Sequence, residues 1–132
     1  MKYSIQRLVN YLEHIGTAID RIARYTEHME KAPFLENTMV QDAVIRNLEI
    51  IGEASHNIET QFSDFAAGHP ELQLAFAYQM RNAVAHGYFK VDFEIVWKTL
   101  HNDLPALRQR IRRAINELSP GAGDEAEPDS PS

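Results

Sequence analysis

The chain has 132 residues, of which 44% are hydrophobic, so it is large enough for one folded domain with a buried core. It contains no cysteine, which excludes disulfides, thiolate metal sites and cysteine nucleophiles. Its 13 basic and 19 acidic residues give a net charge of −6, which argues against an overall basic surface for binding nucleic acid.

The N-terminal stretch MKYSIQRLVNYLEHIG has a charged or amide side chain every few residues, so it lacks the unbroken apolar region of a secretion signal. No segment approaches the run of about 20 apolar residues that a membrane-spanning helix needs. We therefore expect a cytoplasmic protein without a membrane partner.

The first expected helix carries apolar residues at alternating spacings of three and four, with charged residues between them. These residues are Ile5, Leu8, Leu12, Ile15, Ile19, Ile22 and Met29, with a gap at Thr26. The pattern predicts an amphipathic helix with a coiled-coil-like seam. Pro33, in EKAPFLEN, is expected to end it.

A second helix is expected over roughly residues 38–60, where Thr38 and Gln41 in TMVQ fit a capping box. Its expected buried residues are Val40, Val44, Leu48, Ile51 and Ile58. It should end in a loop around SDFAAGHP. A third helix should begin near Pro70, a favoured first position, and stop at Gly87.

A fourth helix is expected after Asp92, a residue suited to cap it. Its apolar residues repeat the seam spacing and are Phe93, Trp97, Leu100, Leu104, Leu107, Ile111, Ile115 and Leu118. Pro105 interrupts this series, so we expect a kink there.

No alternating strand pattern of useful length accompanies these helices, and the connections are short. We therefore predict an all-α fold, an antiparallel four-helix bundle over residues 1–118. Residues 119–132 contain Pro, Gly, Ser and four of the 19 acidic residues, and no large apolar residue. This composition predicts a disordered acidic tail.

The regular seams allow two interpretations. They can bury more apolar surface than four helices hide from one another, which favours a homodimer, or they can belong to an ordinary bundle core. The arginines of LRQRIRR are likewise interpreted as a solvated helix face that complements the helix dipole.

Several classes of enzyme are disfavoured by the motifs. The six histidines contain no His-x-x-x-His pair, so we expect no metal ligand set and no cofactor. No glycine-rich phosphate loop precedes a helix, which argues against P-loop and Rossmann enzymes. No Gly-x-Ser-x-Gly nucleophile elbow is present.

The remaining candidate is RNAVAHGY, residues 81–88, at the expected end of the third helix. Arg81 is suited to grip a phosphate, and His86 to exchange a proton near neutral pH. Asn82 can orient His86 or bind substrate, and Tyr88 can donate a proton or stack on a base. The same residues also suit simple capping of a helix C-terminus, and spacing alone does not decide between the two.

The motif Arg81-x4-His86-x-Tyr88, with Asn82 after the arginine, resembles the signature of HEPN-domain ribonucleases. The stretch MRNAVAHGYFKVDFEIVW is similar to the HepT-like branch, the toxins of HepT/MntA toxin–antitoxin systems. AVIRNLEIIGEASHNI and LHNDLPALRQRI resemble the same branch, so the similarity covers roughly residues 3–118.

This resemblance implies a HEPN-type bundle that dimerises and cleaves RNA as a metal-independent endoribonuclease. It implies that Arg81 and His86 are the catalytic pair, with Asn82 as a supporting polar residue. The implied partner is an MntA-like minimal nucleotidyltransferase antitoxin that attaches AMP to Tyr88, placing negative phosphate beside Arg81.

Glu53, in GEA, lies where the family often has an acidic residue, and it is equally well explained as a solvated helix charge. Two rival functions remain for the chain. One is a non-catalytic HEPN subunit that binds nucleotide or substrate for a nucleotidyltransferase, and the other is a purely structural helical dimer. The pair of Arg81 and His86 favours the ribonuclease, because a binding subunit needs only the arginine.

Overall fold

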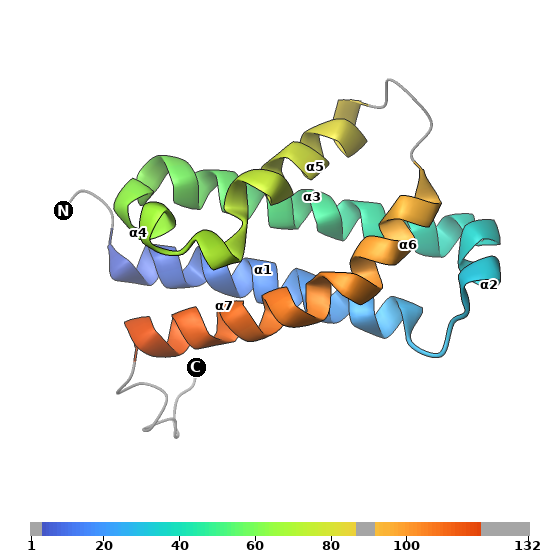
Figure 1. Cartoon of the computed structure of the whole chain (residues 1–132), viewed down its shortest axis with the longest axis horizontal. Helices are drawn as coiled ribbons and strands as arrows, with labels where there is room; N and C mark the ends of the chain where they lie inside the picture. The colour runs from blue at the N-terminus through green and yellow to red at the C-terminus, as the bar shows by residue number, and fades with distance from the viewer. Residues whose placement is uncertain (1–3, 87–91, 120–132) are drawn as a thin grey trace.

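A computed structural model describes residues 4–86 and 92–119, with side chains described through Asn82 before the gap. Every regular element in these ranges is a helix: α1 (Ile5–Thr26), α2 (Lys31–Glu36), α3 (Thr38–Gln61), α4 (Ser63–Gly68), the 3-10 turn η1 (Pro70–Leu72), α5 (Leu74–His86), α6 (Phe93–Asn102) and α7 (Leu104–Leu118). The bundle consists of α1, α3, α5 and the consecutive pair α6 and α7, and neighbours run in opposite directions (Figure 1). The predicted all-α bundle is confirmed.

The first helix begins at a serine cap and ends earlier than its seam predicts. The Ser4 hydroxyl accepts a hydrogen bond from the Arg7 amide at 3.1 Å. The helix stops at Thr26, because Glu27 is extended and His28 has a left-handed φ of 66°. Met29 therefore packs against the core from outside the helix.

Pro33 does not follow the first helix directly but lies in the first turn of α2, where its missing N–H costs little. The expected capping box at the start of α3 is wrong. Asn37 is the cap, and its Oδ1 accepts from the Val40 amide at 3.0 Å. Gln41 instead donates to the Phe34 carbonyl at 2.9 Å, which ties α3 to α2.

The segment expected to be a loop, SDFAAGHP, contains the short helix α4. Pro70 opens only the 3-10 turn η1, because Gln73 adopts a left-handed φ of 52° and interrupts the chain before α5. The third bundle helix thus begins at Leu74, not at Pro70. The predicted stop at Gly87 lies outside the described residues.

The expected fourth helix is two helices. Asp92 caps α6 as predicted, with its carboxylate accepting from the Glu94 amide at 3.0 Å. The kink predicted at Pro105 is a complete break at Asp103, after which α7 begins with the proline in its first turn. The regular apolar spacing predicts one continuous helix here, but α6 and α7 are separate helices joined at Asp103.

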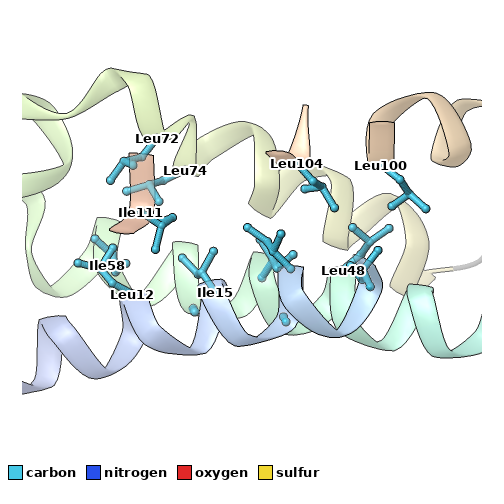
Figure 2. Close-up of a cluster of buried hydrophobic side chains, with 14 of the residues drawn as sticks. Leu12, Ile15, Leu48, Ile58, Leu72, Leu74, Leu100, Leu104 and Ile111 are labelled. Carbon is cyan, nitrogen blue, oxygen red and sulfur yellow. The ribbon is translucent and has the colours of Figure 1, made fainter. Parts of the chain in front are cut away.

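All the bundle helices share a single core of buried side chains. Figure 2 shows residues from α1, α3, α5, η1, α6 and α7 facing the same space, among them Leu12, Ile15, Leu48, Ile58, Leu72, Leu74, Leu100, Leu104 and Ile111. Of the first seam, Leu8 to Ile22 are buried, whereas Ile5 is 46% exposed. In the part of the chain that the structure describes, no helix has the length and apolar content needed to cross a bilayer.

Candidate active site between α3 and α5

The helix α5 lies very close to α3 at a glycine. Gly52 is buried in the middle of α3, where glycine weakens a helix unless packing requires it. A Cβ at this position would overlap the Cβ of Arg81 and lie 2.8 Å from its Cγ and 2.9 Å from the Ala77 carbonyl oxygen. The absence of a side chain at Gly52 therefore places the start of the Arg81 side chain directly against α3.

The Arg81 guanidinium is held by two oxygen atoms. Its Nη2 donates to Glu53 Oε2 at 3.2 Å, which joins α5 to α3, and its Nη1 donates to Asn82 Oδ1 at 2.8 Å. The Arg81 side chain is 27% exposed and that of Glu53 is 66% exposed. The structure thus brings together three of the residues named from sequence at a partly open edge of the bundle.

This arrangement fixes an arginine for the recognition of an anion. A guanidinium has five N–H donors in a planar fork, more than two oxygen partners require. The carboxylate of Glu53 orients the fork, and the Arg81 side chain is partly exposed to solvent. The donors that Glu53 and Asn82 do not use are suited to an anion such as a phosphate.

The other two motif residues are placed only in part. The α5 backbone continues to His86, which lies four residues after Asn82 and hence on nearly the same helix face, one turn further. The side chain of His86 is outside the described side chains, and Tyr88 is outside the described residues. Their positions relative to Arg81 rest on helix geometry and on sequence spacing.

A second contact between the same two helices lies one turn away. His56 of α3 and Tyr78 of α5 stack, with ring centroids 4.0 Å apart and an angle of 15° between the ring planes. Both residues are half-buried. Sequence reasoning assigned neither residue to the site, because only the packing of α5 on α3 brings them together.

Glu53 and His56 also stand three residues apart, a helical spacing that can direct two ligands to one metal ion. The expectation that no histidine of the chain stands in a Glu-x-x-His spacing is therefore wrong. Among the residues described, no group of three His, Asp or Glu side chains could hold a metal ion. The Arg81 cation occupies the carboxylate of Glu53, so these two residues are better suited to orient an arginine than to bind a cation.

The arginines of LRQRIRR lie on α7, and one of them joins α7 to α1. Arg108 forms a bidentate ion pair with Asp20, in which Nη2 lies 3.2 Å from Oδ2. This hydrogen bonding, together with the charges of Arg108, Arg112 and Arg24, holds the pKa of Asp20 below its ordinary value of 3.8, although partial burial opposes the shift. The arginines of LRQRIRR are therefore separate from the group around Arg81. Arg108 joins α7 to α1 through Asp20.

Two larger hollows of the fold also lie away from Arg81. One of about 500 Å³ is lined by residues of α4, η1 and α5, including His69, Gln73 and Phe76. Another of about 370 Å³ lies where α1 meets the break between α6 and α7, beside His28 and His101. Neither includes the side chains that bind the Arg81 guanidinium.

Comparison with known proteins supports the similarity seen in the motif. A family described as "Ribonuclease HepT-like" matches residues 15–114, which include α3, α5 and all the residues named at the site. The chain belongs to this HepT-like ribonuclease family.

Among its relatives, "Probable ribonuclease HepT" of Thermococcus cleftensis is 41% identical over 79% of this chain and 92% of its own length. Two proteins of Methanocaldococcus jannaschii are also similar. "Gamma-glutamylcyclotransferase and putative RNase MJ0434" is 35% identical over 82% of this chain, which spans 47% of that protein. "Putative RNase MJ1380" is 32% identical over 76% of this chain and 90% of its own length. No solved structure matches the chain significantly.

Proposed function

We propose that this chain is the endoribonuclease toxin of a toxin–antitoxin system and that it cleaves RNA without a metal ion. Its membership in the HepT-like ribonuclease family supports the general activity. The observation that carries the proposal is the Arg81 guanidinium, held by Glu53 and Asn82 at a partly open edge, with His86 one turn after Asn82 on the same helix.

The proposed reaction uses the 2′-hydroxyl of RNA as the nucleophile. His86 removes the proton from this hydroxyl, and the oxygen attacks the adjacent phosphorus. Arg81 stabilises the negative charge that develops on the phosphoryl oxygens. The bond from phosphorus to the 5′-oxygen breaks, and the leaving oxygen takes a proton from Tyr88 or water. The products are a cyclic 2′,3′-phosphate and a 5′-hydroxyl end.

Glu53 and Asn82 act through Arg81 in this scheme. They fix the fork before substrate arrives, so less side-chain freedom is lost when the phosphate binds. Before RNA binds, the Glu53 carboxylate also offsets the positive charge of Arg81. We expect Glu53→Gln to retain most of the cleavage rate, because the amide oxygen still accepts from Arg81, whereas Glu53→Ala should raise KM more than it lowers kcat.

The test is cleavage of transfer RNA and total RNA by the purified full chain in excess EDTA. Wild type should cut, and His86→Ala should not. Arg81→Met keeps an unbranched stem over Gly52 but removes the guanidinium, so it should also be inactive while remaining folded. Arg46→Ala is the matched control, since this α3 arginine is 70% exposed and its ion pair is with Glu49, three residues later on the same helix. Activity that disappears with EDTA would refute the metal-independent mechanism.

The products offer a second check. Attack by the 2′-hydroxyl predicts cyclic 2′,3′-phosphate ends, which end-group analysis by mass spectrometry detects. Fragments carrying only 5′-phosphate and 3′-hydroxyl ends would contradict the assigned role of His86. Binding of RNA or nucleotide without any cleavage would support the alternative function, a non-catalytic subunit of a nucleotidyltransferase.

The proposed regulation involves two partners: a second copy of the chain and an MntA-like nucleotidyltransferase antitoxin that AMPylates Tyr88. The family resemblance supports the homodimer, which sedimentation should detect as twice the chain mass of 15.1 kDa. The first apolar seam does not support it, because its side chains from Leu8 to Ile22 are already buried within one chain. Incubation with the transferase and ATP should add one AMP to the wild type and none to Tyr88→Phe. Tyr25→Phe is the control, because Tyr25 is 37% exposed and lies on α1. Full modification of Tyr88→Phe would disprove the assigned site.

A further inference from the structure

The stacked pair of His56 and Tyr78 differs from two other histidines that contact an aromatic ring. His69 stacks on Phe65, and the ring of His101 is tilted by 43° against that of Trp97, each partner lying four positions earlier in the chain. The Nδ1 atoms of His69 and His101 lie 2.9 and 3.0 Å from the carbonyl oxygens of those partners. Those imidazoles are thereby bound to their own segment of chain. His56 stacks across two helices, and within the described ranges neither of its ring nitrogens has a hydrogen-bond partner.

The pair is adjacent to the Arg81 site on both helices. On α3, His56 follows Gly52 by four residues, and Gly52 is the position that contacts Arg81. On α5, Tyr78 precedes Arg81 by three residues. Since an α-helix rises 1.5 Å per residue, the backbone positions of the stacked pair and of the Gly52–Arg81 contact are about 5 Å apart along the helix axes. This separation is comparable with that between the base and the phosphate of one nucleotide.

We propose that His56 and Tyr78 form a binding site for a nucleobase of the RNA, next to the phosphate held by Arg81. The proposal rests on the ribonuclease function proposed above and adds a residue pair that determines which base lies at the site. A base would continue the stack on an outer ring face, and the imidazole nitrogens would form hydrogen bonds with its edge. Half-burial holds the rings in place and leaves part of each accessible.

The chemistry of the pair distinguishes this site from a second phosphate site. Neither ring carries a fixed positive charge, and the flat ring faces contribute through overlap with another aromatic ring. Glu53, three residues before His56, places a carboxylate on the same part of the helix surface, 66% exposed. A carboxylate beside the rings can accept a hydrogen bond from the exocyclic amine of a base.

The experiment measures how much RNA affinity depends on bases. Fluorescence anisotropy gives the Kd of the full chain for a labelled ten-nucleotide 2′-O-methyl oligoadenylate, which lacks the attacking hydroxyl, and for an abasic backbone of equal length and charge. Removal of the bases should weaken binding to wild type about fivefold or more, because a stacked base contributes about 1 kcal/mol or more. In His56→Ala and Tyr78→Ala this ratio should fall below about twofold.

Two controls separate base binding from a structural role. Tyr78→Phe keeps the ring and should keep the base dependence of the wild type. His69→Ala removes a stacked histidine elsewhere and should also leave it unchanged. A wild-type ratio near one, or a ratio that His56→Ala and Tyr78→Ala leave unaltered, would overturn the proposal. Because this oligonucleotide is not cleaved, the result is independent of the assay on natural RNA, so the base site and the nuclease activity can fail separately.

Discussion

The contact of Gly52 with Arg81 predicts that Gly52→Ala lowers the stability of the protein, whereas helix propensity alone predicts that it raises it. Gly52 lies in the interior of α3, and replacing a helix glycine with alanine ordinarily stabilises a protein by up to about 1 kcal/mol. Here the new methyl group would overlap Arg81 Cβ and lie 2.9 Å from the Ala77 carbonyl oxygen. Since both atoms belong to or adjoin the α5 backbone, no rotation of a side chain relieves the clash.

The magnitude follows from the displacement required. Ordinary contacts between heavy atoms are about 3.5–4.0 Å, so α5 has to move away from α3 by more than about 1 Å to relieve the overlap with Arg81 Cβ. Overpacking of this kind costs about 1–3 kcal/mol, which exceeds the gain in helix propensity. We expect Gly52→Ala to lower the free energy of unfolding by about 1–2 kcal/mol and Tm by about 3–10 °C.

The assay is thermal and urea unfolding followed by circular dichroism, with Gly16→Ala as the matched control. Gly16 lies inside α1, and a Cβ there would meet only Ile111 Cγ2 at an ordinary 3.7 Å. Gly16→Ala should therefore be as stable as wild type or more so. The reasoning would be refuted if Gly52→Ala also matched or exceeded wild type, because α5 would then not be pressed against α3.

Two further predictions concern the ends and edges of the helices. Asn37→Ala should lower the free energy of unfolding by about 1 kcal/mol in urea denaturation, because the Asn37 side chain caps α3. Thr38→Ala should change this free energy little. Equal losses in the two variants would instead support a capping box at Thr38. The hydrogen bond from Arg108 lowers the pKa of Asp20. The ionised Asp20 therefore stabilises the fold above about pH 4, and this stabilisation is lost as the pH falls further. In urea titrations, wild type should be more stable than Asp20→Asn by at most about 1 kcal/mol at pH 6, because the Arg108–Asp20 pair is half-exposed. This difference in the free energy of unfolding should become smaller as the pH falls to 3. A difference independent of pH would contradict a stabilising ion pair at Asp20.

The sequence predicts the bundle well because apolar spacing reports directly on which side chains are buried. The seam residues from Leu8 to Ile22 and the α3 residues from Val44 to Ile58 lie in the core as expected. The helix ends were predicted less well, because they depend on contacts between elements. Gln41 has the spacing of a capping residue, but its amide bonds the carbonyl of Phe34 in the preceding helix.

The candidate site was predicted to the extent that its residues share one motif. Arg81 and Asn82 are adjacent in sequence, so their proximity follows from the chain, whereas the ion pair of Arg81 with Glu53 arises from the packing of α5 on α3. Gly52 was missed although an interior helix glycine is a signal of close packing, because its contact with Arg81 spans α3 and α5. The roles of His86 and Tyr88 stay predictions.

The Arg81 side chain is held at both ends, and this affects the entropy of binding. Its Cβ and Cγ lie over Gly52, while its guanidinium is held by Glu53 and Asn82. A free arginine loses about 2 kcal/mol of rotamer entropy when it is immobilised. Much of that loss is incurred once, when the chain folds, and is not repeated at each encounter with substrate. In the proposed function, the packing of α5 on α3 therefore lowers the entropic cost of binding a phosphate.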